Sequence, residues 1–173
     1  MTADTVAIRL ATTSDADAIA TLLAAAFAEF EPLYTPDGFR ATTPTREEIA
    51  QRFADGPVWV VESGTGIAGT VSAVRRADGV HVRSMAVAPV ARGLGLGRVL
   101  LNQVQAFADA EACDHLYLST TPFLSSAIRM YERAGFVPTS APPYELFGTP
   151  LFTMRKWSKS VVLSRLRPAR GRP

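Results

Sequence analysis

The sequence predicts a mixed α/β domain (α/β or α+β in class) in which helices flank one mixed sheet. Strand-like runs separated by short glycine-containing turns occupy residues 58–86, which is typical of an antiparallel meander. A long helix with an apolar stripe then leads to another strand at 116–120, and a helical crossover between two strands implies that they run parallel. A closing hairpin is expected within residues 136–155.

Length and composition indicate one globular domain. The chain has 173 residues and a mass of 18.6 kDa, with 47% hydrophobic and 20% charged residues, which is ordinary for a soluble protein. No apolar run approaches the roughly 18 residues that a membrane span requires, and the N-terminus does not resemble a signal peptide. The single cysteine, Cys113, excludes an internal disulfide. These features predict a cytoplasmic protein with no membrane partner.

The positive charge of the chain is concentrated at its C-terminal end. The net charge is +2, yet residues 159–173 carry five cations and no acid, which leaves the first 158 residues at −3. A basic tail can bind nucleic acid or acidic lipid, but arginine outnumbers lysine along the whole chain, which favours a compositional bias. We therefore expect a single domain over residues 1–158, a flexible tail over 159–173, and no nucleic-acid partner.

Two helices are expected before the meander. A strand at residues 6–10 precedes Ser14, an N-cap candidate with Asp17 three residues later. Thr45 and Glu48 form a capping box that opens a second, short helix. The first helix carries a continuous apolar stripe: Ile19, Leu22, Leu23, Ala26, Phe27 and Phe30.

Between these helices, residues 31–44 are expected to form a loop. The helical pattern stops there, and Pro36-Asp37-Gly38 has the chemistry of a turn. The segment nevertheless carries Leu33, Tyr34 and Phe39. Apolar side chains on a long loop indicate either a lid or pocket wall, or packing back on the core, and the sequence leaves both readings open.

The chain is organised around residues 80–112. Hydrophobic residues alternate through a strand at 80–86 that Pro89 ends, and the glycine-rich run 92–98 leads directly into the long helix. The first turn of a helix has N–H groups without partners and a partial positive charge, and glycines let this backbone approach a ligand closely. The run therefore predicts a turn that binds phosphate groups.

This turn fits neither of the two commonest phosphate-binding motifs. Its third glycine stands one residue too early for the dinucleotide motif, and no G-K-[ST] follows as in a P-loop. It resembles instead the [QR]-x-x-G-x-[GA] signature of the GNAT N-acetyltransferase superfamily, with Arg92, Gly95 and Gly97 in the three defined positions. The run Met85-Ala86-Val87 resembles the family's fourth strand, which splays from the fifth at a bulge. The resemblance implies an acetyl-CoA site made by Met85, Ala86, Val87, Arg92, Gly93, Leu94, Gly95, Leu96, Gly97 and Arg98.

A second half-motif lies downstream. The pattern A-I-x-x-Y-E-x-x-G-F at residues 127–136 is similar to the second acetyl-CoA half-motif of that superfamily, and it implies that Tyr131 lies near the cofactor sulfur. Ser125 is expected to cap this helix and to contact the cofactor. One departure is Leu124, because many relatives have an asparagine at this position that bonds the pantetheine arm. The arm is then held by strand backbone, or by Ser125 or Ser126.

The resemblance extends over residues 58–155 by motif and over 6–55 by element order. It implies a mostly antiparallel sheet of about six to seven strands, about four helices, and a splayed pair of parallel strands. It also implies an N-acetyltransferase that moves an acetyl group from acetyl-CoA to a primary amine by direct attack in a ternary complex. No metal is expected, and a homodimer is a common state in the family. The alternative is a non-catalytic module that binds acyl-CoA as a sensor.

Three catalytic tasks follow from this chemistry. The N–H of Val87 is the candidate to polarise the thioester carbonyl, and Tyr131 is the candidate proton donor to the departing thiolate. His81 stands where some relatives carry a catalytic glutamate, and its ordinary pKa near 6.5 suits a base. A structural histidine with ordered water as the base is an equal alternative, and Glu29, Glu31, Glu62 and Glu145 are weaker candidates.

The resemblance places the acceptor between the loop after the first helix and the closing hairpin. The residues expected there combine aromatic and acidic side chains, which suits a cationic small amine or an aminoglycoside-like acceptor. A protein N-terminus or a lysine is the alternative acceptor. The candidate substrate residues are Glu29, Phe30, Glu31, Tyr34, Phe39, Tyr144 and Glu145.

Overall fold

The computed structural model describes residues 6–64, 66–77 and 79–158. The basic run at 159–173 lies outside the described residues. The described part contains one sheet of eight strands, ordered β1-β2-β3-β4-β5-β8-β6 with β7 paired to β8, and only β4 and β5 are parallel. The strands are β1 (Ala7–Leu10), β2 (Val58–Ser63), β3 (Gly66–Arg76), β4 (Gly79–Val87), β5 (His115–Thr120), β6 (Val137–Pro138), β7 (Tyr144–Leu146) and β8 (Thr149–Trp157).

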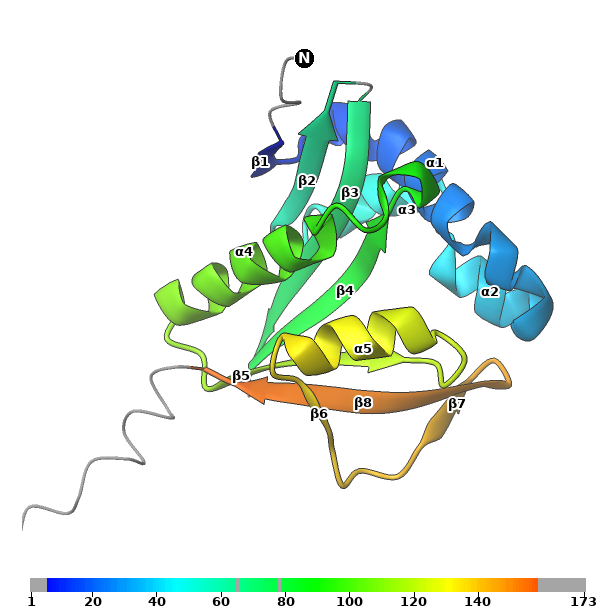
Figure 1. Ribbon diagram of the computed structural model, residues 1–173, viewed down its shortest axis with the longest axis vertical. Helices are drawn as coiled ribbons and strands as arrows, with labels where there is room; N and C mark the ends of the chain where they lie inside the picture. Colours follow the sequence, from blue (N-terminus) through cyan, green and yellow to red (C-terminus); the bar gives the residue numbers. More distant parts are fainter. Residues whose placement is uncertain (1–5, 65, 78, 159–173) are drawn as a thin grey trace, which may run out of the picture.

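Helices cover both faces of this sheet. The described part has five α-helices: α1 (Ala16–Phe27), α2 (Pro36–Thr42), α3 (Arg46–Arg52), α4 (Leu96–Ala110) and α5 (Ser125–Arg133). Figure 1 shows α4 crossing one face of β2–β4, with α1 and α3 behind the same strands. One apolar cluster joins α4 and α5 to the sheet through fully buried residues such as Leu100 and Leu116, and a second joins α1 and α3 to it through Leu23 and Val60. Each such side chain contributes about 1.5–3 kcal/mol when it is removed from water.

The predicted architecture is confirmed, and the element count is slightly larger than expected. The meander β2–β3–β4 is antiparallel, and the crossover through α4 makes β5 parallel to β4. The additional strand is β7, whose three residues pair with the first residues of β8. The additional helix is α2, in the segment for which the sequence predicts a loop.

The loop prediction for residues 31–44 was wrong. A 3₁₀ segment, η2 (Ala28–Leu33), is followed by α2, which begins at Pro36. The Thr35 hydroxyl caps the helix by accepting a hydrogen bond from the Gly38 N–H at 3.1 Å. Proline is favoured in the first turn of a helix as well as in β-turns, so the same residues satisfy both patterns.

The N-cap prediction at Ser14 was also wrong, whereas the one at Thr45 is confirmed. A 3₁₀ turn (Thr13–Asp15) precedes α1, and the Asp15 carboxylate accepts from the Thr12 N–H at 2.8 Å and from two nitrogens of Arg9. These bonds, chiefly those from Arg9, lower the pKa of Asp15 to about 2. At the start of α3, the Glu48 N–H donates to the Thr45 hydroxyl and the Thr45 N–H donates to the Glu48 carboxylate.

Candidate active site

A β-bulge in β4 marks the place where the two parallel strands part. Thr70 and Ser72 of β3 oppose Ala86 and Arg83 of β4, so β4 contains one extra residue in this interval. Ser84, within the interval, has a φ of 51°. On its other edge β4 pairs with β5 only at Val80 and His81 in the described residues. Figure 1 shows the two strands together at one end and separated at the other, with α2 beyond the wide end.

The bulge determines which backbone groups face the gap. Successive residues of a strand direct their N–H and C=O groups to opposite edges. The Ala88 N–H donates to the Ala68 carbonyl of β3 at 2.8 Å, and Ala86 is in register with Thr70 of the same strand. Ala86 and Ala88 therefore bond to β3. The N–H of Val87 consequently points toward the edge that β5 has left.

The glycine-rich turn lies at the N-terminus of α4. Gly93 and Gly95 have φ values of 81° and 78°, which favour glycine, and Gly95 is the N-cap residue. The Arg98 and Val99 N–H groups donate to the Gly95 carbonyl, so the amides that precede them have no acceptor in the helix. A Cβ at Gly93 or Gly95 would meet no atom within 4 Å. The turn is therefore open to a ligand over its glycines.

The side chains next to this turn pack into the core or face solvent. Leu96 is buried in the core, whereas Leu94 is 70% exposed. A Cβ on Gly97 would lie 2.3 Å from the Met130 sulfur of α5, so the Met130 side chain packs directly against the α4 backbone at this glycine. The two sequence half-motifs are thereby brought side by side.

Arg92 joins the turn to the end of α1. Its guanidinium donates to the Ala26 carbonyl at 2.9 Å and forms an ion pair with Glu29 of η2. The sequence predicts that Arg92 contacts the cofactor and that Glu29 contacts the acceptor. The structure brings the two side chains together, so the Glu29 carboxylate is already paired.

Tyr131 lies deep between α5 and the sheet. Its side chain is 8% exposed, and its ring packs edge-on against Phe136 with centroids 6.0 Å apart. Burial, with a smaller contribution from the nearby Tyr34, raises the pKa of Tyr131 to about 12. The hydroxyl therefore stays protonated throughout the neutral range.

Aromatic rings from three segments pack together where the sequence predicts the acceptor. Tyr34 makes edge-on contacts with Phe39 of α2, at 5.9 Å, and with Phe123 after β5, at 4.9 Å. The α2 segment is fastened to the closing hairpin by Thr35, which donates through its hydroxyl to the Phe147 carbonyl at 2.6 Å and through its N–H to the Thr149 hydroxyl at 3.1 Å. These contacts show that the segment packs on the rest of the protein, and its role as a lid or pocket wall stays a prediction.

Comparison with known proteins identifies the family. The model of the family described as "Acetyltransferase (GNAT) family" matches residues 19–136. The chain belongs to the GNAT acetyltransferase family. An uncharacterized N-acetyltransferase of Escherichia coli (strain K12), YjgM, is 31% identical over 137 residues, which span 75% of this chain and 80% of that protein.

Solved structures show the same fold. A GNAT acetyltransferase from Staphylococcus aureus Mu50 superposes with a TM-score of 0.75 at 19% identity and covers 90% of this chain and 100% of its own. The PaiA N-acetyltransferase of Thermoplasma acidophilum, solved with coenzyme A, gives a TM-score of 0.74 at 14% identity and covers 88% of this chain and 99% of its own. The GNAT fold and the enzyme class predicted from the sequence are confirmed.

His81 of this GNAT protein lies beside the point of divergence. It is the last residue of β4 that pairs with β5, and its ring stacks on Tyr117 of β5 with centroids 4.9 Å apart and planes 9° apart. Burial lowers the pKa of His81, and the cations Arg83 and Arg76 lower it further. The imidazole is therefore neutral at pH 7, as a base must be.

The remaining predicted site residues lie on η2, β7 and α5. Tyr144 of β7 is hydrogen-bonded through its hydroxyl to Ser119 of β5 at 2.7 Å, which ties the closing hairpin to the strand. Glu31 and Glu145 have exposed side chains, and Phe30 is half-buried in η2. Ser125 is exposed and is the first residue of α5; it does not cap the helix, because the N-cap residue is Leu124.

Several residues around the site were missed by sequence reasoning. Phe123 and Thr149 have no local signal, because their roles depend on partners far away in the chain. Thr35 had a signal, since a threonine before Pro-Asp is a common helix start. No cluster of three metal-binding side chains occurs in the ranges that the structure describes, and no helix within them is long and apolar enough to cross a membrane.

Proposed function

We propose that this GNAT protein transfers an acetyl group from acetyl-CoA to a small primary amine while both are bound. Acetyl-CoA supplies the acetyl group as an activated thioester. The observation that carries the proposal is the juxtaposition of an open glycine turn at the N-terminus of α4 with the unpaired edge of β4. A diphosphate is well matched to the first feature and an extended pantetheine arm to the second.

Backbone groups hold and polarise the donor in this proposal. The free N–H groups of residues 93–97 bind the diphosphate at the positive end of the α4 dipole. The N–H of Val87 donates to the thioester oxygen, on which negative charge grows as the amine attacks. A preorganised donor of this kind contributes about 3–4 kcal/mol to transition-state stabilisation.

Proton transfers complete the reaction. The bound ammonium first loses one proton and becomes a nucleophilic amine. The amine nitrogen then forms a bond to the acetyl carbon, the carbon–sulfur bond breaks, and the nitrogen loses a second proton, which restores the Tyr131 hydroxyl after it has protonated the thiolate. Tyr131, which burial keeps protonated, meets the departing thiolate with its hydroxyl. His81 accepts the first of these protons directly or through water, because it is neutral at pH 7 and lies next to the gap between β4 and β5.

A small acceptor is favoured by the closure of the acceptor side. The α2 segment is bonded to the closing hairpin. The ring of Tyr34 contacts those of Phe39 and Phe123, and Tyr34 lies close enough to Tyr131 to affect its pKa. A protein N-terminus or a lysine side chain would need this segment to move aside. Glu31 and Glu145 are exposed, and their negative charge would favour a cationic amine.

The test is a panel of amines assayed by release of free thiol from acetyl-CoA. Small amines, aminoglycosides, peptides with a free N-terminus and lysine peptides are compared at equal concentration, with an independent measurement of acetyl-CoA affinity. We expect turnover with at least one small primary amine. Tight binding of acetyl-CoA without turnover across the panel would overturn the enzyme proposal in favour of a sensor.

A further inference from the structure

The bulge residue Ser84 has a backbone conformation that needs support. Its φ of 51° lies in the left-handed region, which is unfavourable for a residue with a Cβ and unusual inside a sheet. Such a conformation persists only where the surrounding structure enforces it, and it occurs often beside functional groups. The contacts of Ser84 therefore identify what holds the bulge.

Two hydrogen bonds from neighbouring elements hold this part of β4. Arg52, the last residue of α3, donates through Nη1 to the Ser84 hydroxyl at 2.8 Å. The Ser72 hydroxyl of β3 donates to the carbonyl of Arg83 at 3.1 Å. The bulge is thus fastened on both sides, and the bond to Arg52 reaches the strained residue itself.

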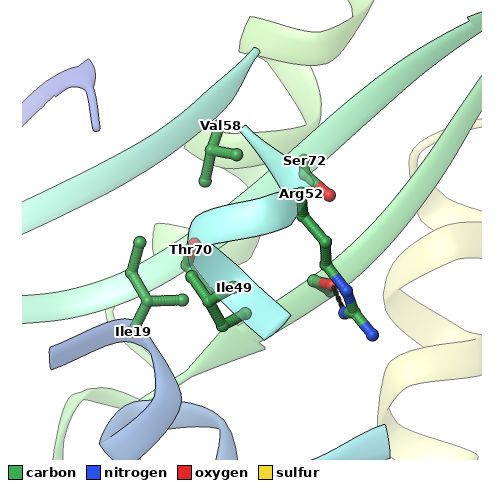
Figure 2. A pocket seen from close by; sticks show the side chains of 7 residues that line it. Ile19, Ile49, Arg52, Val58, Thr70 and Ser72 are labelled. Atoms are coloured by element: carbon green, nitrogen blue, oxygen red, sulfur yellow. Dashed lines mark hydrogen bonds between the residues drawn. The ribbon is translucent and has the colours of Figure 1, made fainter. Parts of the chain in front are cut away.

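The approach of Arg52 to the bulge is fixed by the packing of α3. Figure 2 shows the Arg52 side chain beside a small pocket that Ile19, Ile49 and Val58 also line. Ile49 is 3% exposed and anchors α3 one turn before Arg52. The guanidinium is therefore carried by a rigid element.

The orientation of the Val87 amide depends on this bulge. One extra residue shifts the alternation of the strand by one step. With the bulge, Ala86 and Ala88 bond to β3 and the Val87 N–H faces the gap. In a regular strand the Val87 N–H would instead point to β3, and no donor from this residue would face the thioester.

We propose that Arg52 is a positioning residue, which holds Ser84 in the bulge and thereby aims the Val87 N–H at the thioester oxygen. The inference rests on the proposed acetyl transfer. It assigns no chemical role to Arg52, which lies on the α1/α3 face of the sheet. Its effect passes through the backbone of residues 84–87.

The test uses four variants and a matched control. A general loss of stability would not produce the pattern of kcat values that we expect. Arg52→Gln and Ser84→Ala both remove the hydrogen bond and keep a Cβ at φ 51°, and we expect kcat to fall about tenfold or more in each, with the KM for acetyl-CoA nearly unchanged. Ser84→Gly relieves the strain, since glycine adopts this φ freely. We expect near-normal kcat in Ser84→Gly and recovery of kcat in the double variant Arg52→Gln/Ser84→Gly. Arg75→Gln, which removes an ion pair with Glu111 far along β3, is the matched control.

A second readout does not require turnover. The ¹⁵N–¹H resonance of Val87 is followed during titration with acetyl-CoA, and its shift is expected in the wild type, lost in Arg52→Gln and restored in the double variant. A wild-type kcat or a wild-type shift in Arg52→Gln, or an unrescued double variant, would overturn the positioning role. Absence of acetyl-CoA binding in the wild type would overturn the proposed function instead.

Discussion

Replacing Tyr131 by phenylalanine separates the chemical role of its hydroxyl from the packing of its ring. The ring lies in the core against Phe136, and phenylalanine preserves that contact, so we expect the free energy of unfolding to change by less than about 1 kcal/mol. Loss of a proton donor to the leaving group lowers rates by about 10²–10⁴-fold. A hundredfold fall in kcat corresponds to about 2.7 kcal/mol. The dissociation constant for acetyl-CoA should stay within about twofold, because the diphosphate and carbonyl contacts are untouched.

The assay measures kcat by release of free thiol with the best amine, and the dissociation constant for acetyl-CoA by calorimetry on the same preparation. Because burial raises the pKa of Tyr131 to about 12, the wild-type kcat should show no decline from this group below about pH 10. Thermal unfolding of both proteins controls for misfolding. A kcat within threefold of wild type, or an affinity that falls as far as kcat, would refute the role of the hydroxyl.

Three further predictions address the turn, the base and the N-terminal ion pair. Gly95→Ala places a Cβ on a residue with a φ of 78°. It should lower the free energy of unfolding by about 1–2 kcal/mol and weaken acetyl-CoA binding about tenfold, as measured by calorimetry. The control is Gly66→Ala, which is also at positive φ in open space and should leave the affinity for acetyl-CoA unchanged. His81→Gln should lower kcat about tenfold or more. In the wild type, kcat should decline below pH 6.5 as His81 becomes protonated, because burial lowers the pKa of His81, and this decline should be absent in His81→Gln. An unchanged pH profile would mean that water accepts the proton of the amine. Asp15→Asn should destabilise the fold at pH 7 by about 1–2 kcal/mol, because the bonds from Arg9 lower the pKa of Asp15. This stability is present above the unfolded pKa near 3.8 and is lost as the pH falls toward 2, so chemical denaturation of the two proteins should converge at low pH.

The parts of the fold that the sequence predicts correctly are those with local causes. The capping box at Thr45 and Glu48 needs only residues within one turn. The glycine turn is recognisable because Gly95 supplies a backbone conformation that other residues avoid and because an apolar stripe starts immediately after it. The parallel pairing of β4 and β5 follows from the helix between them.

The parts that the sequence does not predict depend on distant partners. α2 forms where a turn was expected, and its buried Gly38 packs against Thr149, more than a hundred residues away. The ion pair of Arg92 with Glu29 links two motifs that the sequence assigned to different ligands. The family resemblance implied a bulge in β4, but its position at Ser84 has no local signature, since serine rarely adopts a positive φ and its support comes from Arg52 on another element.

The most direct measurement is a crystal structure of the protein with acetyl-CoA. Our account predicts diphosphate oxygens within hydrogen-bond distance of the N–H groups of residues 93–97, and the acetyl carbonyl oxygen within that distance of the Val87 N–H. A cofactor bound away from the α4 N-terminus, or a thioester that points away from Val87, would contradict it.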